Sequence, residues 1–347
     1  MKIIAFYLPQ FHCIPENDRW WGKGFTEWTN TRKAKPLFSG HNQPREPYLN
    51  NYYDLTDSSA RKWQAEIARK YGIYGFCYYH YWFKGKRLLE KPFNEVLQTG
   101  EPDFPFCLSW ANEAWTRIWD GGKNHVLMPQ TYGNKKDWKE HFDYLLKAFL
   151  DKRYIRINNK PIFLIYRPES IDCCEEMLSF WDQLAIEAGL DGIYFIKTLN
   201  GFWNKEQKGF HACVEFEPMY TLRHDYPKNP SLLDRRPYPL VDYDYVWRRI
   251  INRKQSTKYN IPVIPGSFVD WDNSPRLGKK GLIFKGVSPE KFGKYLHLQI
   301  QRTKSVNNSD FLFINAWNEW AEGTYLEPDK RNKFRYLEEV KKALDDS

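Results

Sequence analysis

The sequence lacks the long apolar run that a membrane helix requires. No stretch of its 347 residues reaches the roughly 18 consecutive apolar residues of a membrane span. The apolar run over residues 3–8 is too short for a signal peptide, and no small-residue cleavage site follows it. We therefore expect no membrane span and a cytoplasmic location.

Cysteine is scarce, and its spacing is not that of a metal site. The six cysteines form no C-x-x-C pair, and Cys173 and Cys174 are adjacent. A zinc site and a disulfide framework are therefore not expected. Cys77, Cys107 and Cys213 lie in apolar runs, where cysteine commonly behaves as a small buried side chain. This pattern suits a reducing compartment.

Glycine-rich phosphate-binding motifs are missing too. No G-x-G-x-x-G follows an apolar run, and the P-loop motif does not occur. We therefore expect neither a nucleotide-binding domain nor a cofactor, and no metal. The chain also has no Pro/Gly/Ser linker and no fixed-period repeat, which predicts a single domain over residues 1–347.

Charge and aromatic content indicate the kind of ligand. Lys plus Arg number 52 against 43 acidic residues, a formal charge of +9, but the cations are scattered among acids. We interpret them as solvated surface and expect no nucleic-acid partner. Aromatic residues make up 18% of the chain. Aromatic rings stack on the C–H faces of sugars, so this excess favours an oligosaccharide or polysaccharide ligand, although an aromatic-rich core explains it equally well.

Short apolar runs alternate with longer segments that can form helices, as in βα units. Eight such runs occur, over residues 3–8, 75–79, 106–110, 162–166, 193–197, 212–216, 263–268 and 311–316. Helices are expected over residues 57–71, 90–97, 135–150, 170–188, 203–208, 243–259, 288–302 and 334–344. Eight units predict an α/β fold, a (β/α)8 TIM barrel, with a doubly wound open sheet as the alternative.

The first βα connection is unusually long. Residues 9–56, about 48 in all, show no convincing helix or strand, against a usual connection of about 4 to 6 residues. Long loops of this kind are commonly functional. This one leaves the carboxyl end of the first strand, the face on which barrel enzymes hold their active sites.

Polar and aromatic residues follow nearly every predicted strand, and in a barrel they would converge on one mouth. Carboxylates, amides and indoles together are what glycosidic chemistry needs, although some of them could instead pair with arginines as structural ion pairs. The substrate-binding candidates are Tyr7, His12, Trp28, His80, Trp82, Trp110, Asn112, Glu113, Tyr166, Glu215, Glu217, Asp270, Trp271 and Asn318.

Glu319 and Glu322 are the catalytic candidates. They lie three residues apart just beyond the last predicted strand, so a helical turn would place both carboxylates on one side. Like-charge repulsion would then raise one pKa, which leaves one group protonated as the acid and the other ionised as the base. An arbitrary E-x-x-E is more often a surface pair, but the flanking Trp317, Trp320 and Gly323 favour a site.

A second acidic pattern, Asp270-Trp271-Asp272, has the D-x-D spacing of glycosyltransferases that bind a metal and a nucleotide sugar. Those enzymes use a nucleotide-binding sheet rather than an eight-fold pattern. We therefore interpret these residues as ligands of sugar hydroxyls or as partners in structural salt bridges. His80 has no companion ligand nearby, so a metal is not expected there.

The segment Asn-Glu-Trp-Ala-Glu-Gly-Thr at residues 318–324 resembles the N-E-W-x-E-G-T signature of glycoside hydrolase family 99, the endo-α-mannosidases and endo-α-mannanases. Segments 6–12, 20–28, 75–83 and 110–115 resemble the WbsX-type family, which is related to family 99 and occurs in bacterial surface-polysaccharide gene clusters. Outside the signature the sequence departs from the mannosidases, most of all in the long first loop.

The resemblance implies a retaining hydrolase of an α-linked bacterial glycan. Glu319 would deprotonate the 2-hydroxyl of the substrate to give a 1,2-anhydro sugar, Glu322 would act as acid and base, and Asn318 would help bind the sugar. Because WbsX-type proteins are often labelled glycosyltransferases, a transferase or transglycosylase of O-antigen or capsule biosynthesis is the alternative. A third possibility is a glycan-binding protein without catalytic activity.

Overall fold

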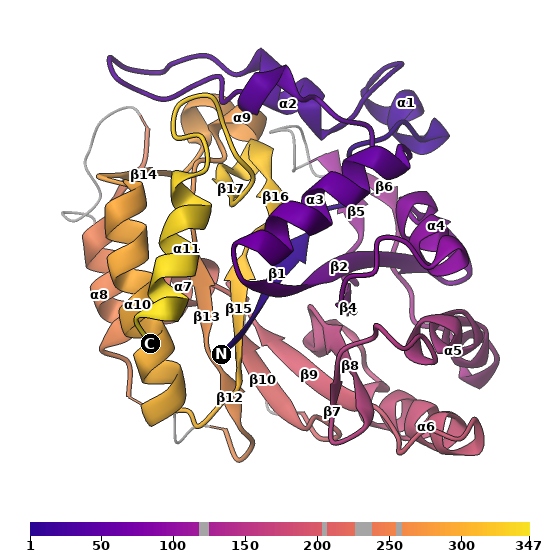
Figure 1. Cartoon of the computed structure of the whole chain (residues 1–347). Helices are drawn as coiled ribbons and strands as arrows, with labels where there is room; N and C mark the ends of the chain where they lie inside the picture. The colour runs from indigo at the N-terminus through magenta and orange to yellow at the C-terminus, as the bar shows by residue number, and fades with distance from the viewer. Residues whose placement is uncertain (118–124, 203–206, 226–237, 255–258) are drawn as a thin grey trace.

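The computed structural model describes residues 1–117, 125–202, 207–225, 238–254 and 259–347. Its centre is a parallel sheet whose paired strands run in the order β12-β10-β9-β8-β4-β2-β1-β15-β13 (Figure 1). These strands are β1 (Lys2–Tyr7), β2 (Ile73–Phe83), β4 (Phe106–Trp110), β8 (Lys160–Ile165), β9 (Tyr194–Leu199), β10 (Ala212–Glu215), β12 (Val263–Ile264), β13 (Gly266–Phe268) and β15 (Phe311–Asn315).

The sheet closes on itself. β12 and β13 are two halves of one run interrupted by Pro265, and they pair with β10 and β15 respectively. β15 in turn pairs with β1, where Ala5 lies opposite Ile314. The two ends of the strand order are thus the same strand position, which makes eight positions in all, and the predicted (β/α)8 barrel is confirmed.

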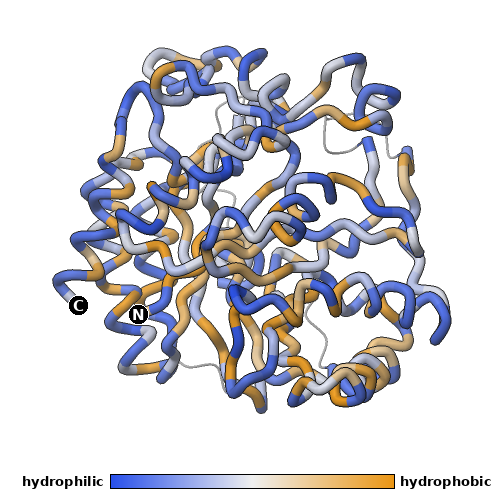
Figure 2. Tube along the Cα trace, turned by 45° about the vertical axis from the view of Figure 1, so that its right-hand side comes forward, coloured by the Kyte–Doolittle hydropathy of each residue, from blue (hydrophilic) through white to orange (hydrophobic). Residues whose placement is uncertain are grey.

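Helices surround the strands, and Figure 2 shows apolar residues along the strands with hydrophilic residues outside. Their bounds are α1 (Pro15–Trp21), α2 (Glu27–Lys33), α3 (Ser58–Lys70), α4 (Lys91–Thr99), α5 (Lys135–Phe149), α6 (Cys174–Glu187), α7 (Met219–His224), α8 (Tyr243–Ile251), α9 (Ser274–Leu277), α10 (Pro289–Ser305) and α11 (Arg335–Asp345). Single 3-10 turns are η1 (Tyr48–Asn50), η3 (Pro168–Ser170), η4 (Gly278–Lys280) and η5 (Trp320–Glu322).

Short strands pair beside the barrel: β3 (Lys86–Leu88), β5 (Trp115–Thr116), β6 (Val126–Met128), β7 (Arg156–Ile157), β11 (Leu240–Asp242), β14 (Ile283–Lys285), β16 (Asn318–Glu319) and β17 (Thr324–Tyr325). The helix starts follow local capping chemistry. Asp57 accepts a hydrogen bond from the N–H of Ser59 at 2.8 Å before α3, and Ser288 caps α10 with Pro289 in its first turn.

The first loop differs from its prediction, because it contains α1, α2 and η1. Both helices are only seven residues long, too short to show a periodic pattern. Pro15 stands in the first turn of α1, and the N–H of Thr26 donates to Thr29 Oγ1 at 3.2 Å at the start of α2. At this end of the barrel, α2 lies beside α9 (Figure 1).

The helix expected over 243–259 ends at Ile251, and Arg253, two residues later, pairs with Glu215 of β10 and with Glu217. Most of the helix expected over 203–208 lies outside the described residues.

Ring contacts identify which side chains point into the barrel. The ring of Phe6 on β1 lies 5.1 Å from that of Phe216, which follows β10, although β1 and β10 are not neighbours in the sheet. This contact therefore crosses the interior. Phe6 also stacks on Tyr79 at 5.7 Å, and Tyr166 meets Phe216 at 5.4 Å. Because side chains alternate along a strand, the neighbours of these residues point outward.

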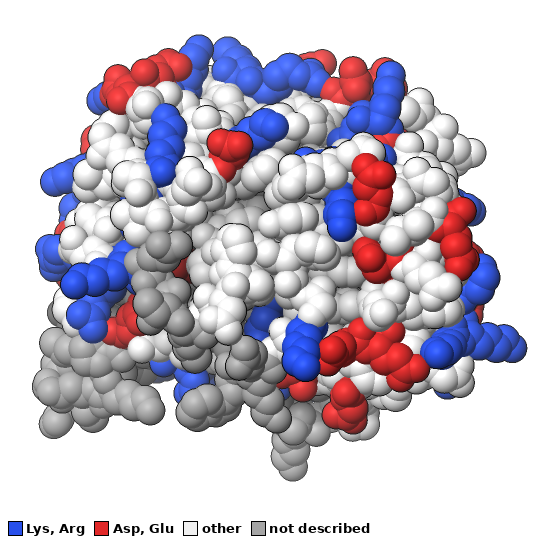
Figure 3. Space-filling model, turned by 90° about the horizontal axis from the view of Figure 1, so that it is seen from below, with Lys and Arg blue, Asp and Glu red and all other residues white. Residues whose placement is uncertain are grey.

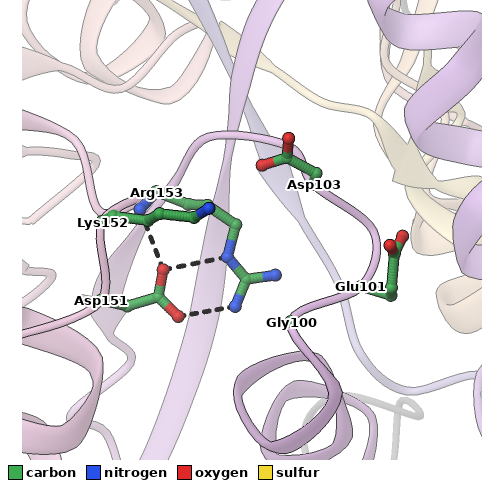
Figure 4. A pocket seen from close by; sticks show the side chains of 6 residues that line it. All are labelled: Gly100, Glu101, Asp103, Asp151, Lys152 and Arg153. Atoms are coloured by element: carbon green, nitrogen blue, oxygen red, sulfur yellow. Dashed lines mark hydrogen bonds and ion pairs between the residues drawn. The ribbon is translucent and has the colours of Figure 1, made fainter.

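On the face at the opposite end from α1 and α2, the charged side chains that the structure describes have structural roles and do not form a binding site. Figure 3 shows Lys and Arg interspersed with Asp and Glu on this face. A hollow here lies just before β4 and β8 and includes Gly100, Asp103 and Lys152 (Figure 4). Arg153 donates to Asp151 across it at 2.6 and 2.9 Å. Residues at this amino-terminal end of a barrel commonly serve stability.

Candidate active site

The segment after the last barrel strand forms a tight hairpin at the carboxyl end of the barrel. β16 pairs with β17, so that Glu319 lies opposite Thr324, and η5 forms the turn between them. Gly323 closes the turn with φ of 69°, and a Cβ there would lie 2.9 Å from the backbone nitrogen of Asp272. A glycine is therefore required on both grounds. The turn is a single 3-10 turn rather than a longer helix.

Arg276 on α9 joins three carboxylates at this hairpin. Its guanidinium lies 2.5 Å from Glu322 Oε1, 2.5 Å from Glu27 Oε1 and 3.4 Å from Glu319 Oε2. Glu27 comes from the start of α2, so the long first loop supplies one wall. Three negative groups around one cation leave an excess of negative charge in a buried place.

This charge excess changes the acidity of both glutamates. Burial, and then the charge of Glu322, raise the pKa of Glu319 well above its ordinary value, against the opposing effect of Arg276. Burial also raises the pKa of Glu322, and Arg276 again opposes the shift. Arg276 lies closer to Glu322 than to Glu319, so its guanidinium favours the ionised form of Glu322 more strongly than that of Glu319.

Three tyrosines surround the glutamates. Burial and then the charge of Glu319 raise the pKa of Tyr79 and of Tyr81. Burial, followed by the charges of Glu113, Glu322 and Glu319, raises the pKa of Tyr166. All three hydroxyls therefore stay protonated at neutral pH. Within the described part of the chain they have no hydrogen-bond partner. They are therefore available to bind ligand hydroxyls.

Glu113 was a predicted ligand and lies near Tyr166 at this mouth. Its Oε1 accepts a hydrogen bond from Arg167 Nη1 at 2.7 Å, and burial raises the pKa of Glu113. The guanidinium of Arg167 also lies 4.0 Å from the centre of the Phe202 ring. The structure thus brings together Glu113, Tyr166, Glu319 and Glu322 from the predicted set.

Asn318 has a structural position instead of the predicted sugar contact. Its side chain is fully buried. Its Oδ1 accepts from the N–H of Leu8 at 2.7 Å, and its Nδ2 donates to the carbonyl of Leu8 at 3.0 Å. The amide therefore joins the hairpin of β16 and β17 to the end of β1, and this geometry does not support direct sugar binding.

Several predicted ligands point out of the barrel, because a strand alternates its faces. Tyr7, next to inward Phe6, donates to Gln64 of α3 at 2.7 Å. β2 extends to Phe83, so Tyr79 and Tyr81 face inward while His80 and Trp82 face outward. His80 contacts His141 of α5 at 2.8 Å, and the indoles of Trp82 and Trp110 pack on the same histidine ring. These positions do not support sugar binding.

Trp28, His12 and Asn112 also have structural contacts. Trp28 is buried, and its Nε1 donates to the carbonyl of Tyr53 at 2.9 Å. His12 is buried, and its Nδ1 lies 3.0 Å from the carbonyl of Pro9. The side chain of Asn112 binds the backbone of Arg167 twice, since it accepts from the N–H and donates to the carbonyl, both at 2.8 Å.

Glu215 and Glu217 lie on the outer side of the barrel, on the opposite face from Phe216. Both are buried and contact Arg253 at 2.9 and 2.8 Å, and Arg302 lies 3.4 Å from Glu215. The alternative weighed from the sequence, structural ion pairs, describes these two residues better than sugar binding.

The Asp270-Trp271-Asp272 segment also forms structural contacts. Asp270 pairs with Arg45 at 2.8 Å, and Asp272 accepts hydrogen bonds from Gln43 at 2.7 Å and contacts His41 at 2.8 Å. Trp271 is buried in the core. Salt-bridge partnership, one of the two interpretations from the sequence, is therefore what the geometry shows for the aspartates.

Sequence reasoning missed Arg276, Glu27 and Tyr79, and it placed Tyr81 after the second strand without choosing it as a site residue. The sequence could have predicted the two tyrosines, because side chains alternate between the two faces of a strand and a second strand that extends to Phe83 places Tyr79 and Tyr81 on its inner face. Arg276 and Glu27 lie in short helices far from the motif in sequence, so only the fold joins them. Among the described residues, no group of three or more His, Cys, Asp or Glu side chains could hold a metal ion. No helix in this part of the chain is long and apolar enough to cross a membrane.

Comparison with solved structures places the fold. The chain superposes on the family 99 endo-α-mannosidase of Bacteroides thetaiotaomicron with a TM-score of 0.59 and 15% identity, covering 99% of this chain and 96% of that one. A glycoside hydrolase-like protein gives a TM-score of 0.62 at 13% identity, covering 99% and 93%. At these identities the likeness concerns the fold alone.

Sequence comparison identifies the family. The uncharacterized protein WxcX of Xanthomonas campestris pv. campestris strain B100 is 36% identical over 350 residues, covering 99% of this chain and 49% of WxcX. WxcX of strain ATCC 33913 is also 36% identical, over 348 residues, with the same coverage. The chain therefore spans about half the length of the curated relatives it matches. The family model described as glycosyltransferase WbsX matches residues 3–340, and the chain belongs to the WbsX family.

Proposed function

We propose that this chain hydrolyses an α-linked bacterial glycan with retention of anomeric configuration, using Glu319 and Glu322. The observation that carries the proposal is the pair of glutamates, Glu319 buried and Glu322 partly buried, that share Arg276 at the carboxyl end of the barrel. The three tyrosine hydroxyls beside them support a ligand rich in hydroxyl groups. The N-E-W-x-E-G-T resemblance supplies the roles of the two glutamates.

The proposed chemistry has two steps. In the first, the Glu319 carboxylate takes the proton of the sugar 2-hydroxyl, O2 attacks C1, the glycosidic C1–O bond breaks, and Glu322 protonates the leaving oxygen. In the second, Glu322 takes a proton from water, the water oxygen bonds to C1, the C1–O2 bond of the 1,2-anhydro sugar breaks, and Glu319 returns its proton to O2. Two inversions at C1 give net retention.

The proposed roles require a proton on Glu322 and a charge on Glu319, the reverse of the preference that the contacts of Arg276 give the two groups. Arg276 contacts both groups, so a shift of its guanidinium from Glu322 toward Glu319 would reverse the preference. We therefore include in the proposal that substrate binding changes the partners of Arg276. The Glu27 contact keeps the guanidinium at the site during this change.

A screen of the purified protein against capsule and O-antigen oligosaccharides, followed by proton NMR of the anomeric product, tests the proposal. We expect the α-anomer to form first. A 2-deoxy analogue of any cleaved substrate should not react, because it lacks the hydroxyl that attacks C1. An enzyme that cleaves the 2-deoxy analogue at a comparable rate would contradict the anhydro-sugar route.

A transferase of surface-polysaccharide biosynthesis is the second candidate, and the glycosyltransferase description of the matching family favours it. Calorimetry with a panel of nucleotide sugars, with and without Mg²⁺ or Mn²⁺, separates the two. Binding of a nucleotide sugar together with inactivity toward all glycans would favour the transferase. The ion pairs of Asp270 and Asp272 count against a metal-bound nucleotide at that segment.

A further inference from the structure

A buried carboxylate lies directly behind the catalytic hairpin. Glu327 is 3% exposed. Its Oε2 accepts hydrogen bonds from Tyr53 OH at 2.8 Å and Trp320 Nε1 at 2.6 Å, and its Oε1 accepts from Gln64 Nε2 at 2.6 Å. All three donors are uncharged. Burial raises the pKa of Glu327 to about 7, and the hydrogen bonds oppose that shift.

The hydrogen bonds of Glu327 reach the residues on both sides of Glu319. Trp320 follows Glu319 and donates directly to Glu327. Asn318 precedes Glu319, and its Nδ2 lies 3.4 Å from the Tyr53 hydroxyl, which itself donates to Glu327. The peptide units around Glu319 are therefore connected to one carboxylate from both directions.

The ring of Trp320 is held as well as its nitrogen. It stacks on Tyr325 with a centroid distance of 3.9 Å and an interplanar angle of 14°, and it lies 5.2 Å from Trp28. The indole therefore cannot turn without breaking its bond to Glu327. Since Trp320 is adjacent to Glu319 in the chain, fixing this ring restricts the direction of the Glu319 side chain.

We propose that Glu327 is a positioning residue that orients Glu319 by binding the residues on either side of it. The inference rests on the proposed function in taking Glu319 as the catalytic base. A carboxylate suits this place because both of its oxygens accept. A glutamine would direct its NH2 group toward donors on one side, which leaves buried donors facing each other.

Hydrogen–deuterium exchange followed by mass spectrometry tests the positioning without needing a substrate. In Glu327→Gln we expect the amides of Leu8 and of residues 317–326 to exchange roughly tenfold faster, because the local hydrogen bonds weaken. Asp244→Asn is the matched control, since Asp244 accepts from Lys291 and Tyr295 of α10 and, within the described part of the chain, from no residue of the hairpin. Unchanged exchange in this segment, or an equal increase along the whole chain, would overturn the proposal.

Kinetics test the consequence for catalysis. On a glycan that the wild type cleaves, Glu327→Gln should lower kcat by about 10- to 100-fold with little change in KM, because a small displacement of a reacting group costs rate rather than binding. Equal loss of kcat in Asp244→Asn, or wild-type kcat in Glu327→Gln, would overturn the inference.

The two hypotheses can fail separately. If the wild type cleaves no glycan, the proposed function fails, while the exchange experiment still decides whether Glu327 holds the hairpin. If Glu327→Gln does not fold, Trp320→Phe deletes only the Nε1 donor and should increase exchange in the same segment. No increase in that variant would also contradict the proposal.

Discussion

Two groups of buried carboxylates lie near the carboxyl ends of the barrel strands, and they differ in how their oxygens are used. Outside the barrel, Glu217 accepts from Arg253 at 2.8 Å and from the N–H of Thr221 at 3.1 Å. Inside the mouth, among the residues that the structure describes, Glu319 has one hydrogen bond, at 3.4 Å from Arg276. The outer carboxylate is satisfied, whereas the inner one has open acceptor positions.

The use of the carboxylate oxygens distinguishes a structural carboxylate from a catalytic candidate near the same end of the barrel. Burial raises the pKa of both Glu217 and Glu319, so the direction of the shift does not separate them. Occupied acceptors and a matched cation indicate a structural role. Open acceptors and an excess of negative charge indicate a group that can exchange a proton with a ligand.

The largest effect should come from the inner group. Glu322→Ala should lower turnover of a cleaved glycan by about 10²- to 10⁴-fold, because it removes the proposed acid and base. Steady-state kinetics measure this, and the fold can be checked by circular dichroism. Glu290→Ala, which removes an exposed carboxylate paired with Arg335, is the control and should retain wild-type turnover. Wild-type turnover in Glu322→Ala would end the proposal.

The outer group should affect stability instead. Arg253→Met leaves the buried carboxylates of Glu215 and Glu217 without their closest cation, which should cost about 3 to 5 kcal/mol in the free energy of unfolding. Urea denaturation measures this cost. Arg335→Met breaks an exposed pair with Glu290 and should cost less than about 1 kcal/mol. A loss of turnover in folded Arg253→Met without loss of stability would contradict the structural role of Glu215 and Glu217.

Sequence reasoning recovered the barrel because eight apolar runs carry the strand signal locally. It placed Glu319 and Glu322 just beyond the last barrel strand, where the structure has them, and their catalytic roles stay a prediction. It assigned side chains to the wrong face of a strand where the predicted strand ended too early. Ending the second strand at Tyr79 placed His80 and Trp82 in the mouth, whereas its extension to Phe83 points them outward. Arg276 lies 46 residues from Glu322, so their contact follows only from the closed fold.

Arg276→Met should change the pH dependence of the inner group. The guanidinium lowers the pKa of both Glu319 and Glu322, so its removal raises both values. The proposed mechanism needs Glu319 ionised and Glu322 protonated, so both limbs of the pH–rate profile should move to higher pH, and these limbs report the two interacting groups together. Arg276→Lys keeps a charge and should partly restore the wild-type profile. A profile that stays in place would show that Arg276 does not set these acidities.

The smallest expected effect concerns the tyrosine hydroxyls of the mouth. Tyr81→Phe removes one hydroxyl whose pKa is raised by burial and by Glu319, and which has no partner among the described residues. If that hydroxyl binds a sugar, the loss of one hydrogen bond should lower kcat/KM by roughly 3- to 10-fold, which corresponds to about 0.5 to 1.5 kcal/mol. Because no residue that the structure describes bonds to this hydroxyl, we expect no loss of stability. Tyr154→Phe is the opposite control, since the Tyr154 hydroxyl donates to the carbonyl of Ile162 at 2.8 Å and should affect stability alone. Destabilised Tyr81→Phe with unchanged kcat/KM would mean that this inner tyrosine is as structural as the outer carboxylates.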